Sequence, residues 1–237
     1  MAHLIFNKDL AGLHGTRYHG RRRFLETCDM KSRKSKKGRV MNGLLMGSVL
    51  ALALGAVIAA QGGGRRPSSP AGSSSTQIGS NWIDMTYGRP LTRGRDVFGS
   101  GATYGAITHT DGAPIWRAGA NVSTRLKTEV PLVINGKTVP AGEYSVFIDV
   151  KTPTDWTFIL SNWPAQTTYD PNNKAALWGS FGYTPDKDVV RAPMRVSQTA
   201  TSVDELTWLF VNVTPAGGSL EIAWDKTVAV VPFKVGS

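Results

Sequence analysis

Short segments in which apolar and polar residues alternate dominate the chain from residue 81 onward. In 143–150 the side chains of Tyr144, Val146 and Ile148 share one face, and in 219–225 those of Leu220 and Ile222 do the same. A period of two, interrupted by Gly, Pro, Asn and Asp, is typical of strands in an antiparallel sheet. The pattern predicts strands at 82–87, 123–130, 132–135, 143–150, 155–162, 189–197, 206–213, 219–225 and 228–235.

The connections between these segments favour one architecture. Residues 152–155, Thr-Pro-Thr-Asp, supply a turn between 143–150 and 155–162 and predict a hairpin. Segment 206–213 is apolar on both faces, as expected of a central strand, and nothing after residue 62 shows a sustained helical stripe. We therefore expect an all-β domain of about eight or nine strands, arranged as a two-sheet antiparallel β-sandwich of jelly-roll type.

The N-terminal third has a different pattern. Residues 31–39 carry six basic side chains, and the uncharged apolar run 40–60 and the small residues 59–62 follow them. This order of segments predicts a secretory signal peptide, and therefore a bacterial protein that is periplasmic or secreted. The run is also long enough to span a bilayer, so an uncleaved helix anchored in the inner membrane through residues 40–60, with the β domain outside the cytoplasm, is the alternative.

Two features of the head leave its start and its export route open. Arg21, Arg22 and Arg23 resemble a twin-arginine signal, but a further basic stretch separates them from the apolar run, so Sec-type export is the other possibility. Translation from Met30 or Met41 instead of Met1 would remove most of this region. The predicted organisation is a basic region at 1–39, a signal or anchor at 40–61, a Gly/Ser/Pro linker at 62–80 and the β domain at 81–237.

The net charge of +10 comes entirely from the N-terminal residues 1–66. Residues 1–66 hold thirteen basic and three acidic side chains, whereas 67–237 hold fourteen of each. A neutral β domain lacks the basic surface that nucleic-acid binding requires, and we expect no nucleic-acid partner.

Several blocks in the β domain resemble a bacterial family called domain of unknown function 2911 (DUF2911). The first are Tyr-Gly-Arg-Pro at 87–90, Arg-Gly-Arg-Asp-Val-Phe-Gly at 93–99 and Trp-Arg-Ala-Gly-Ala-Asn at 116–121. Further blocks are Asn-Gly-Lys at 135–137, Pro-Ala-Gly-Glu-Tyr-Ser at 140–145, Trp-Gly at 178–179 with Tyr183, and Asp-Val-Val-Arg at 188–191. The resemblance covers residues 82–233 and implies a secreted or periplasmic β protein, with no activity or catalytic residue to transfer.

This chain departs from the family pattern in two places. The stretch 100–114 is longer than the family's usual connection, and Val122 stands where the family has an acidic residue. A role for that acid is therefore in doubt here.

The residues of the β domain argue against most catalytic chemistries. The only cysteine, Cys28, precedes the domain, and His109 is its only histidine, in a loop without a nucleophile-elbow motif. We therefore expect no metal site, no thiol catalysis and no Ser-His-Asp triad. No glycine-rich loop leads into a helix, so we expect no nucleotide cofactor and no other cofactor.

Arginines beside aromatic residues are the candidate binding residues. A guanidinium offers a planar fork of donors for carboxylate or phosphate and stacks on aromatic rings. The candidates are Arg89, Arg93, Arg95, Trp116, Arg117, Asn121, Trp178, Tyr183, Asp188 and Arg191. The competing interpretation is that these residues brace loops, for example through a pair between Arg191 and Asp96 or Asp188.

Three functions remain open. We favour a non-enzymatic binding module of the cell envelope that holds a glycan or an anionic small molecule, which predicts a concave patch where at least three of the arginines meet. A structural or interaction protein predicts buried ion pairs, with an exposed apolar patch or an open strand edge elsewhere. A hydrolase of envelope polymers predicts two carboxylates facing each other across a cleft.

Overall fold

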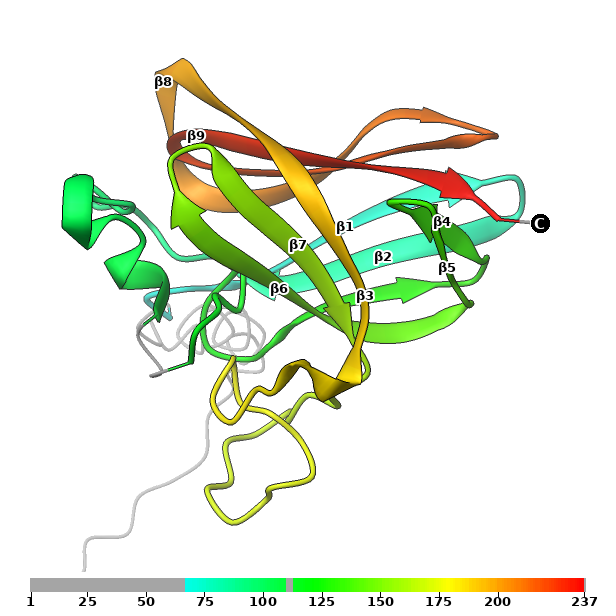
Figure 1. The fold of residues 1–237 in the computed structure, drawn as a ribbon, viewed down its shortest axis with the longest axis horizontal. Coiled ribbons are helices and arrows are strands. Elements are labelled where there is room, and N and C mark those ends of the chain that lie inside the picture. Colours follow the sequence, from blue (N-terminus) through cyan, green and yellow to red (C-terminus); the bar gives the residue numbers. More distant parts are fainter. Residues whose placement is uncertain (1–66, 110–112, 237) are drawn as a thin grey trace, which may run out of the picture. The chain divides into compact units, whose positions relative to one another are not determined.

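The computed structural model describes residues 67–109 and 113–236 of the chain. These residues form one antiparallel nine-stranded sheet of order β1-β2-β3-β6-β7-β8-β9-β4-β5 (Figure 1). Three short 3-10 helices, η1 (Gly101–Thr103), η2 (Ala106–His109) and η3 (Pro185–Lys187), are the only helical segments of this part. The predicted all-β antiparallel class is confirmed. The strands are β1 (Ala71–Ile78), β2 (Asn81–Gly88), β3 (Thr124–Thr128), β4 (Leu132–Ile134), β5 (Lys137–Val139), β6 (Gly142–Thr152), β7 (Asp155–Ser161), β8 (Asp188–Thr214) and β9 (Gly217–Val235).

The expected division into two separate sheets is not confirmed, because β8 is continuous over 27 residues. Its first part pairs with β7, from Asp188 to Met194, and the remainder pairs with β9, from Arg195 onward. The segments expected as separate strands at 189–197 and 206–213 are thus one strand, and 219–225 and 228–235 both lie in β9. Register shifts in the β8–β9 pairing let the strands bend without ending.

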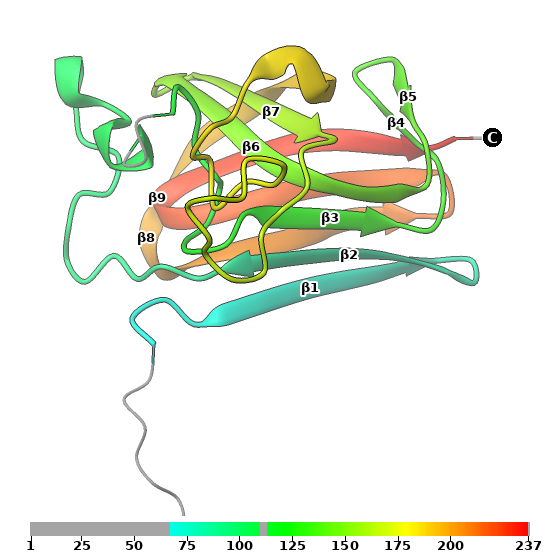
Figure 2. The same cartoon turned by 90° about the horizontal axis from the view of Figure 1, so that it is seen from below.

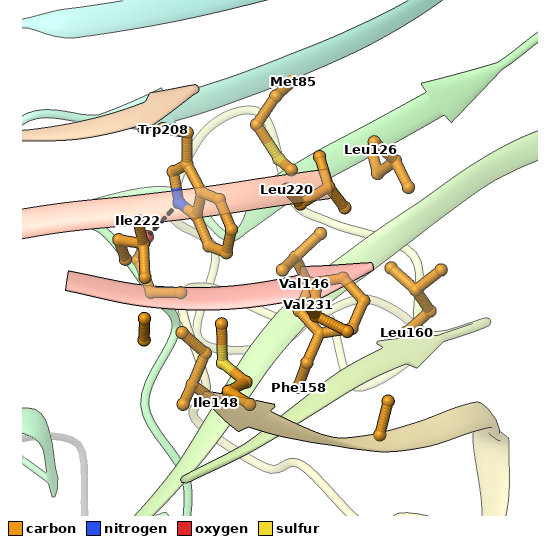
Figure 3. Packing of buried hydrophobic residues seen from close by; sticks show 14 of the residues in the cluster. Met85, Leu126, Val146, Ile148, Phe158, Leu160, Trp208, Leu220, Ile222 and Val231 are labelled. Atoms are coloured by element: carbon orange, nitrogen blue, oxygen red, sulfur yellow. Dashed lines mark hydrogen bonds between the residues drawn. The ribbon is translucent and has the colours of Figure 1, made fainter. Parts of the chain in front are cut away.

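The long strands carry the sheet over on itself, so that β8 and β9 lie behind β3 and β6 in Figure 2. Apolar side chains from the two halves meet in one core, and the rings of Phe158 in β7 and Trp208 in β8 are 6.2 Å apart (Figure 3). The inward faces predicted from alternation are confirmed, since Val146, Ile148, Leu220 and Ile222 are all buried.

Strand β1 lies within the predicted 62–80 linker and covers eight of its residues. It pairs along its whole length with β2, and its Ser74 hydroxyl donates to the Trp208 carbonyl at 2.5 Å. The Ser- and Gly-rich composition suggested a flexible spacer, but the backbone of an edge strand forms its hydrogen bonds whatever its side chains are. Residues 71–78 therefore belong to the β domain.

The predicted signal or anchor helix, the basic head and the three possible start residues lie outside the described residues. Within residues 67–109 and 113–236, no helix is long and apolar enough to cross a membrane.

A second, smaller core lies on the other face of β6 and β7. Phe147 and Ile159 pack there against Ile115, Leu177 and Tyr183. Two irregular segments, residues 113–123 and 162–187, contribute these partners, and the second extends as loops from the body of strands (Figure 1). These segments carry five of the ten candidate site residues.

Candidate functional site

Trp116 anchors the segment that precedes β3. Its backbone exchanges two hydrogen bonds with Ile148 of β6, at 2.8 and 2.9 Å. Its indole is buried and stacks on Trp224 of β9, with ring centroids 5.9 Å apart and planes 18° from parallel. The next residue, Arg117, is therefore held in a fixed position beside the core.

A hollow of about 310 Å³ opens next to this tryptophan pair. It brings together five of the ten predicted site residues, namely Arg95, Trp116, Arg117, Asn121 and Trp178, and Ser69, Pro90, Gly119, Ala120 and Trp224 complete its lining. We call it the arginine pocket. Two of these described lining residues are basic and none is acidic.

Backbone carbonyls orient the first of the two arginines. The Arg95 guanidinium donates from Nε to the Thr92 carbonyl at 2.9 Å and from Nη2 to the Leu91 carbonyl at 2.8 Å. Arg95 is exposed and forms no ion pair with any described residue. Its charge is therefore positioned but not neutralised by the part of the chain that the structure describes.

The loop that carries Arg95 is fastened to β8. Leu206 donates its backbone N–H to the Pro90 carbonyl at 3.0 Å, and Thr92 donates its own to the Asp204 carbonyl at 2.8 Å. The Thr92 hydroxyl also donates to the Asp204 carboxylate, and this bond, together with the Arg93 backbone N–H, lowers the pKa of that carboxyl.

Arg117 and Asn121 close the other side of the pocket. Arg117 Nη1 donates to the Asn121 carbonyl at 2.7 Å, and Asn121 Nδ2 donates to the Ser69 carbonyl at 3.3 Å. Asn121 has a φ of 62°, a left-handed conformation that Asn tolerates better than most residues.

Arg89 and Arg93 do not line the pocket. Arg89 pairs with Glu205 of β8 at 2.9 Å and donates to the Thr207 hydroxyl at 3.4 Å. Arg93 Nη2 donates to the Ser68 carbonyl at 3.1 Å. The pocket thus contains two of the candidate arginines and not the three that a ligand site was expected to show.

The remaining candidates, Tyr183, Asp188 and Arg191, form a separate cluster with Asp149 of β6. The Tyr183 hydroxyl and Arg191 Nη1 donate to Asp188 Oδ2 at 2.7 and 2.9 Å, and Arg191 Nη2 reaches Asp149 Oδ2 at 3.2 Å. Burial raises the pKa of Tyr183, and the hydrogen bond and negative charge of Asp188 raise it further. The predicted pair between Arg191 and Asp188 is present, and this cluster braces the start of β8 against β6.

Asp96, the other suggested partner of Arg191, is engaged elsewhere. Its Oδ1 accepts backbone N–H bonds from Phe98 at 3.3 Å and Gly99 at 2.8 Å. It therefore shapes its own loop.

The sequence of the β domain matches a known protein family. A family model described as "Protein of unknown function (DUF2911)" matches residues 69–233. The chain belongs to this family. Comparisons with curated proteins and with solved structures found no significant match.

Close backbone contacts explain the glycines in the first DUF2911 blocks. A Cβ on Gly88 would lie 2.0 Å from the Ala120 carbonyl oxygen, and one on Gly119 would lie 2.7 Å from Thr124 Oγ1. The Ala118 carbonyl accepts bonds from Trp208 Nε1 at 3.0 Å and from Thr124 Oγ1 at 3.1 Å. The glycines let these segments pack together and build the wall of the arginine pocket.

Sequence reasoning missed Trp224 as a site residue. Alternation in 219–225 puts it on the same face as Leu220 and Ile222, and it is buried as they are. The structure adds that it lines the pocket and that its Nε1 has no hydrogen-bond partner among the described residues. No signal in the sequence distinguishes such a residue from an ordinary core tryptophan.

The DUF2911 domain shows no group of three or more His, Cys, Asp or Glu residues placed to hold a metal ion, within the described residues. His109 ends the 3-10 helix η2.

Proposed function

We propose that the DUF2911 domain is a non-enzymatic binding module of the bacterial cell envelope, whose arginine pocket holds the carboxylate or phosphate of a glycan or other small molecule. The observation that carries this proposal is the meeting of Arg95 and Arg117 beside Trp116, Trp178 and Trp224, with no acidic residue in the described lining. Guanidinium forks recognise planar anions with two donors, and flat indoles pack against the rest of a ligand.

The scaffold and location are part of the same proposal. The sheet that folds over on itself serves as a β-sandwich-like frame, which keeps the pocket walls rigid. The basic stretch 31–39 and the apolar run 40–60 support export to the periplasm or the exterior, or retention at the inner membrane through the uncleaved run.

A thermal-shift screen of the full chain against carboxylated and phosphorylated sugars and metabolites tests the binding role. A ligand at a hundred times its Kd adds about 2.7 kcal/mol to the free energy of unfolding. For a domain of this size that raises Tm by about 5–10 °C. Arg95→Gln should weaken the affinity for the hit at least about tenfold, because a charge-assisted bond is lost.

Arg195→Gln is the matched control, because Arg195 is an exposed arginine of β8 that does not line the pocket. If Arg95→Gln and Arg195→Gln change the affinity equally, the arginine pocket is not the binding site.

A structural or interaction role is the second candidate. The ion pairs of Arg89 with Glu205 and of Arg191 with Asp188 and Asp149 favour it, because they fasten loops to strands. It predicts that no compound in the screen raises Tm. It also predicts a large loss of stability when these pairs are removed.

A hydrolase of envelope polymers is the third candidate. Asp96 and Asp225 both line a polar hollow of about 580 Å³ that also contains Arg95. This role predicts release of reducing ends from envelope polysaccharide, and its loss in Asp96→Asn and Asp225→Asn variants. Without such release, the carboxylates only shape their loops.

A further inference from the structure

Tyr169 and Phe181 are the two most exposed large apolar side chains of the described residues, at 55 and 54 %. Both line another hollow, of about 140 Å³, together with Trp178. We call these three residues the aromatic shelf. Exposed aromatic groups gathered at one hollow mark a binding surface, because their contact area stays in water until a partner covers it.

The shelf is held in place by buried hydrogen bonds. Gln166 is buried, and its Nε2 lies within hydrogen-bond distance of the carbonyls of Asp170, Asn173 and Ala176, at 2.9 to 3.2 Å. Its Oε1 accepts the Asp170 backbone N–H at 2.8 Å. One amide therefore fixes the loop that presents Tyr169.

The loop that carries Trp178 and Phe181 is fastened by Ser123, the residue that precedes β3. The hydroxyl of the buried Ser123 lies 2.6 Å from the Gly179 carbonyl and 3.3 Å from the Leu177 carbonyl. The rings of Tyr169 and Trp178 are 5.8 Å apart at 59°. Because the shelf is formed before binding, little conformational entropy is lost when a ligand covers it.

The polar neighbours of the shelf narrow the choice of ligand. Asp170, Asn173 and Lys174 line the same hollow, and Lys174 Nζ lies 5.8 Å from the Phe181 ring centroid. Flat apolar rings bordered by donors and acceptors complement a sugar ring, which has an apolar C–H face and an edge of hydroxyl groups. A purely apolar ligand would leave these polar groups without partners.

Trp178 connects the shelf to the arginine pocket, because it lines both hollows. A single ligand longer than one ring can therefore contact the aromatic faces and the two arginines together. We propose that the ligand is an acidic oligosaccharide, with a carboxylate-bearing sugar in the arginine pocket and the adjoining ring on the aromatic shelf. This inference rests on the proposed binding function and names its ligand class.

Calorimetric titration of the full chain with three probes tests the inference. The probes are a tetrasaccharide of alternating N-acetylglucosamine and N-acetylmuramic acid, the neutral tetrasaccharide of N-acetylglucosamine, and N-acetylmuramic acid alone. The acidic tetrasaccharide should bind at least about tenfold more tightly than either other probe, because it alone combines ring contacts with carboxylates.

Variants separate the two parts of the surface. Tyr169→Ala with Phe181→Ala should weaken the acidic tetrasaccharide about tenfold or more and leave N-acetylmuramic acid unchanged, because only the longer ligand reaches the shelf. Arg95→Gln should weaken both charged ligands. Trp82→Ala is the matched control, since Trp82 is exposed on β2 and lines neither hollow, and it should change nothing.

The two proposals fail in different ways. If N-acetylmuramic acid binds through Arg95 but the tetrasaccharide binds no more tightly and ignores the shelf variants, the acidic-oligosaccharide inference is overturned and the arginine pocket stands. If the neutral tetrasaccharide binds equally well and Arg95→Gln has no effect, the acidic ligand class and the arginine pocket are both overturned. No binding by any of the three probes overturns the inference, while the wider screen still tests the pocket.

Discussion

The α-carbon of Gly88 lies so close to Ala120 that a Cβ on Gly88 would be 2.0 Å from the Ala120 carbonyl oxygen. This approach joins the end of β2 to the segment that carries Arg117. The wall of the arginine pocket therefore depends on the absence of a side chain at one residue.

Gly88→Ala should lower the free energy of unfolding by about 3 kcal/mol or more, because backbone must move away from the new methyl group. Gly79→Ala is the comparison. Gly79 has a φ of 62° and nothing within 4 Å of an added Cβ, so only the left-handed backbone conformation costs energy, about 1 kcal/mol. Urea unfolding of both variants measures the difference, and equal losses would contradict this account of the contact.

Two buried tryptophans differ in their indole bonding. Trp208 Nε1 donates to the Ala118 carbonyl at 3.0 Å, whereas Trp224 Nε1 has no partner among the described residues. Both Trp→Phe changes lose ring volume, but only Trp208→Phe also loses a hydrogen bond. It should therefore destabilise the fold by about 1 kcal/mol more than Trp224→Phe, as measured by denaturant unfolding. A larger loss for Trp224→Phe would show that its indole N–H has a partner.

The raised pKa of Tyr183 predicts a loss of stability in alkali. Burial is the main cause, and the bond to Asp188 adds to it. In the unfolded chain a tyrosine ionises near pH 10, so above that pH the unfolded state binds fewer protons than the folded state. The stabilisation is complete below pH 10 and decreases above it, by up to about 1.4 kcal/mol per pH unit.

Urea unfolding at several pH values from 9 to 11.5 measures this decrease. Tyr183→Phe should show a shallower decrease than the wild type, whatever its stability at pH 8. Tyr169→Phe, which removes an exposed phenol, is the control. Identical slopes for the wild type and Tyr183→Phe would show that the buried phenol ionises normally.

The energetic coupling between Arg89 and Glu205 tests the structural role that is the second candidate function. Each side chain is 32 % exposed, so water and salt screen the pair. A double-mutant cycle with Arg89→Gln and Glu205→Gln should give a coupling of about 0.5–1 kcal/mol that decreases in 1 M salt. A coupling well above 2 kcal/mol that resists salt would instead support a bracing role for this arginine block.

Sequence alternation predicted the strands that place every second side chain in the main core. The segments 143–150 and 155–162 agree closely with β6 and β7, because their apolar side chains meet the core at every second position. Strand β1 escaped this reasoning, since its position depends on backbone pairing with β2 and only Ile78 at its end is buried. The continuity of β8 was not predicted either, because bends in a strand leave the same polar interruptions in a sequence as turns do.

The residue types of the site could be predicted from the sequence. Which of those residues lie together could not. The arginine and tryptophan blocks pointed to Arg95, Arg117 and Trp178, but sequence cannot show that residues 61 positions apart, such as Arg117 and Trp178, line one hollow. Arg89 and Arg191 carry the same chemistry and are held in ion pairs instead. Tyr169 and Phe181 lie in an irregular segment, where no period indicates which side chains remain exposed.

The arginine pocket is tested most directly through the indole N–H resonances of the chain's seven tryptophans. Isotope-labelled full chain is titrated with N-acetylmuramic acid, and each resonance is assigned by a Trp→Phe variant. The account predicts saturable shifts of Trp178 and Trp224, which line the pocket, an unmoved Trp82, and loss of the shifts in Arg95→Gln. Pocket resonances that stay in place would rule out N-acetylmuramic acid as a ligand, and pocket resonances that move equally in Arg95→Gln would contradict the arginine pocket.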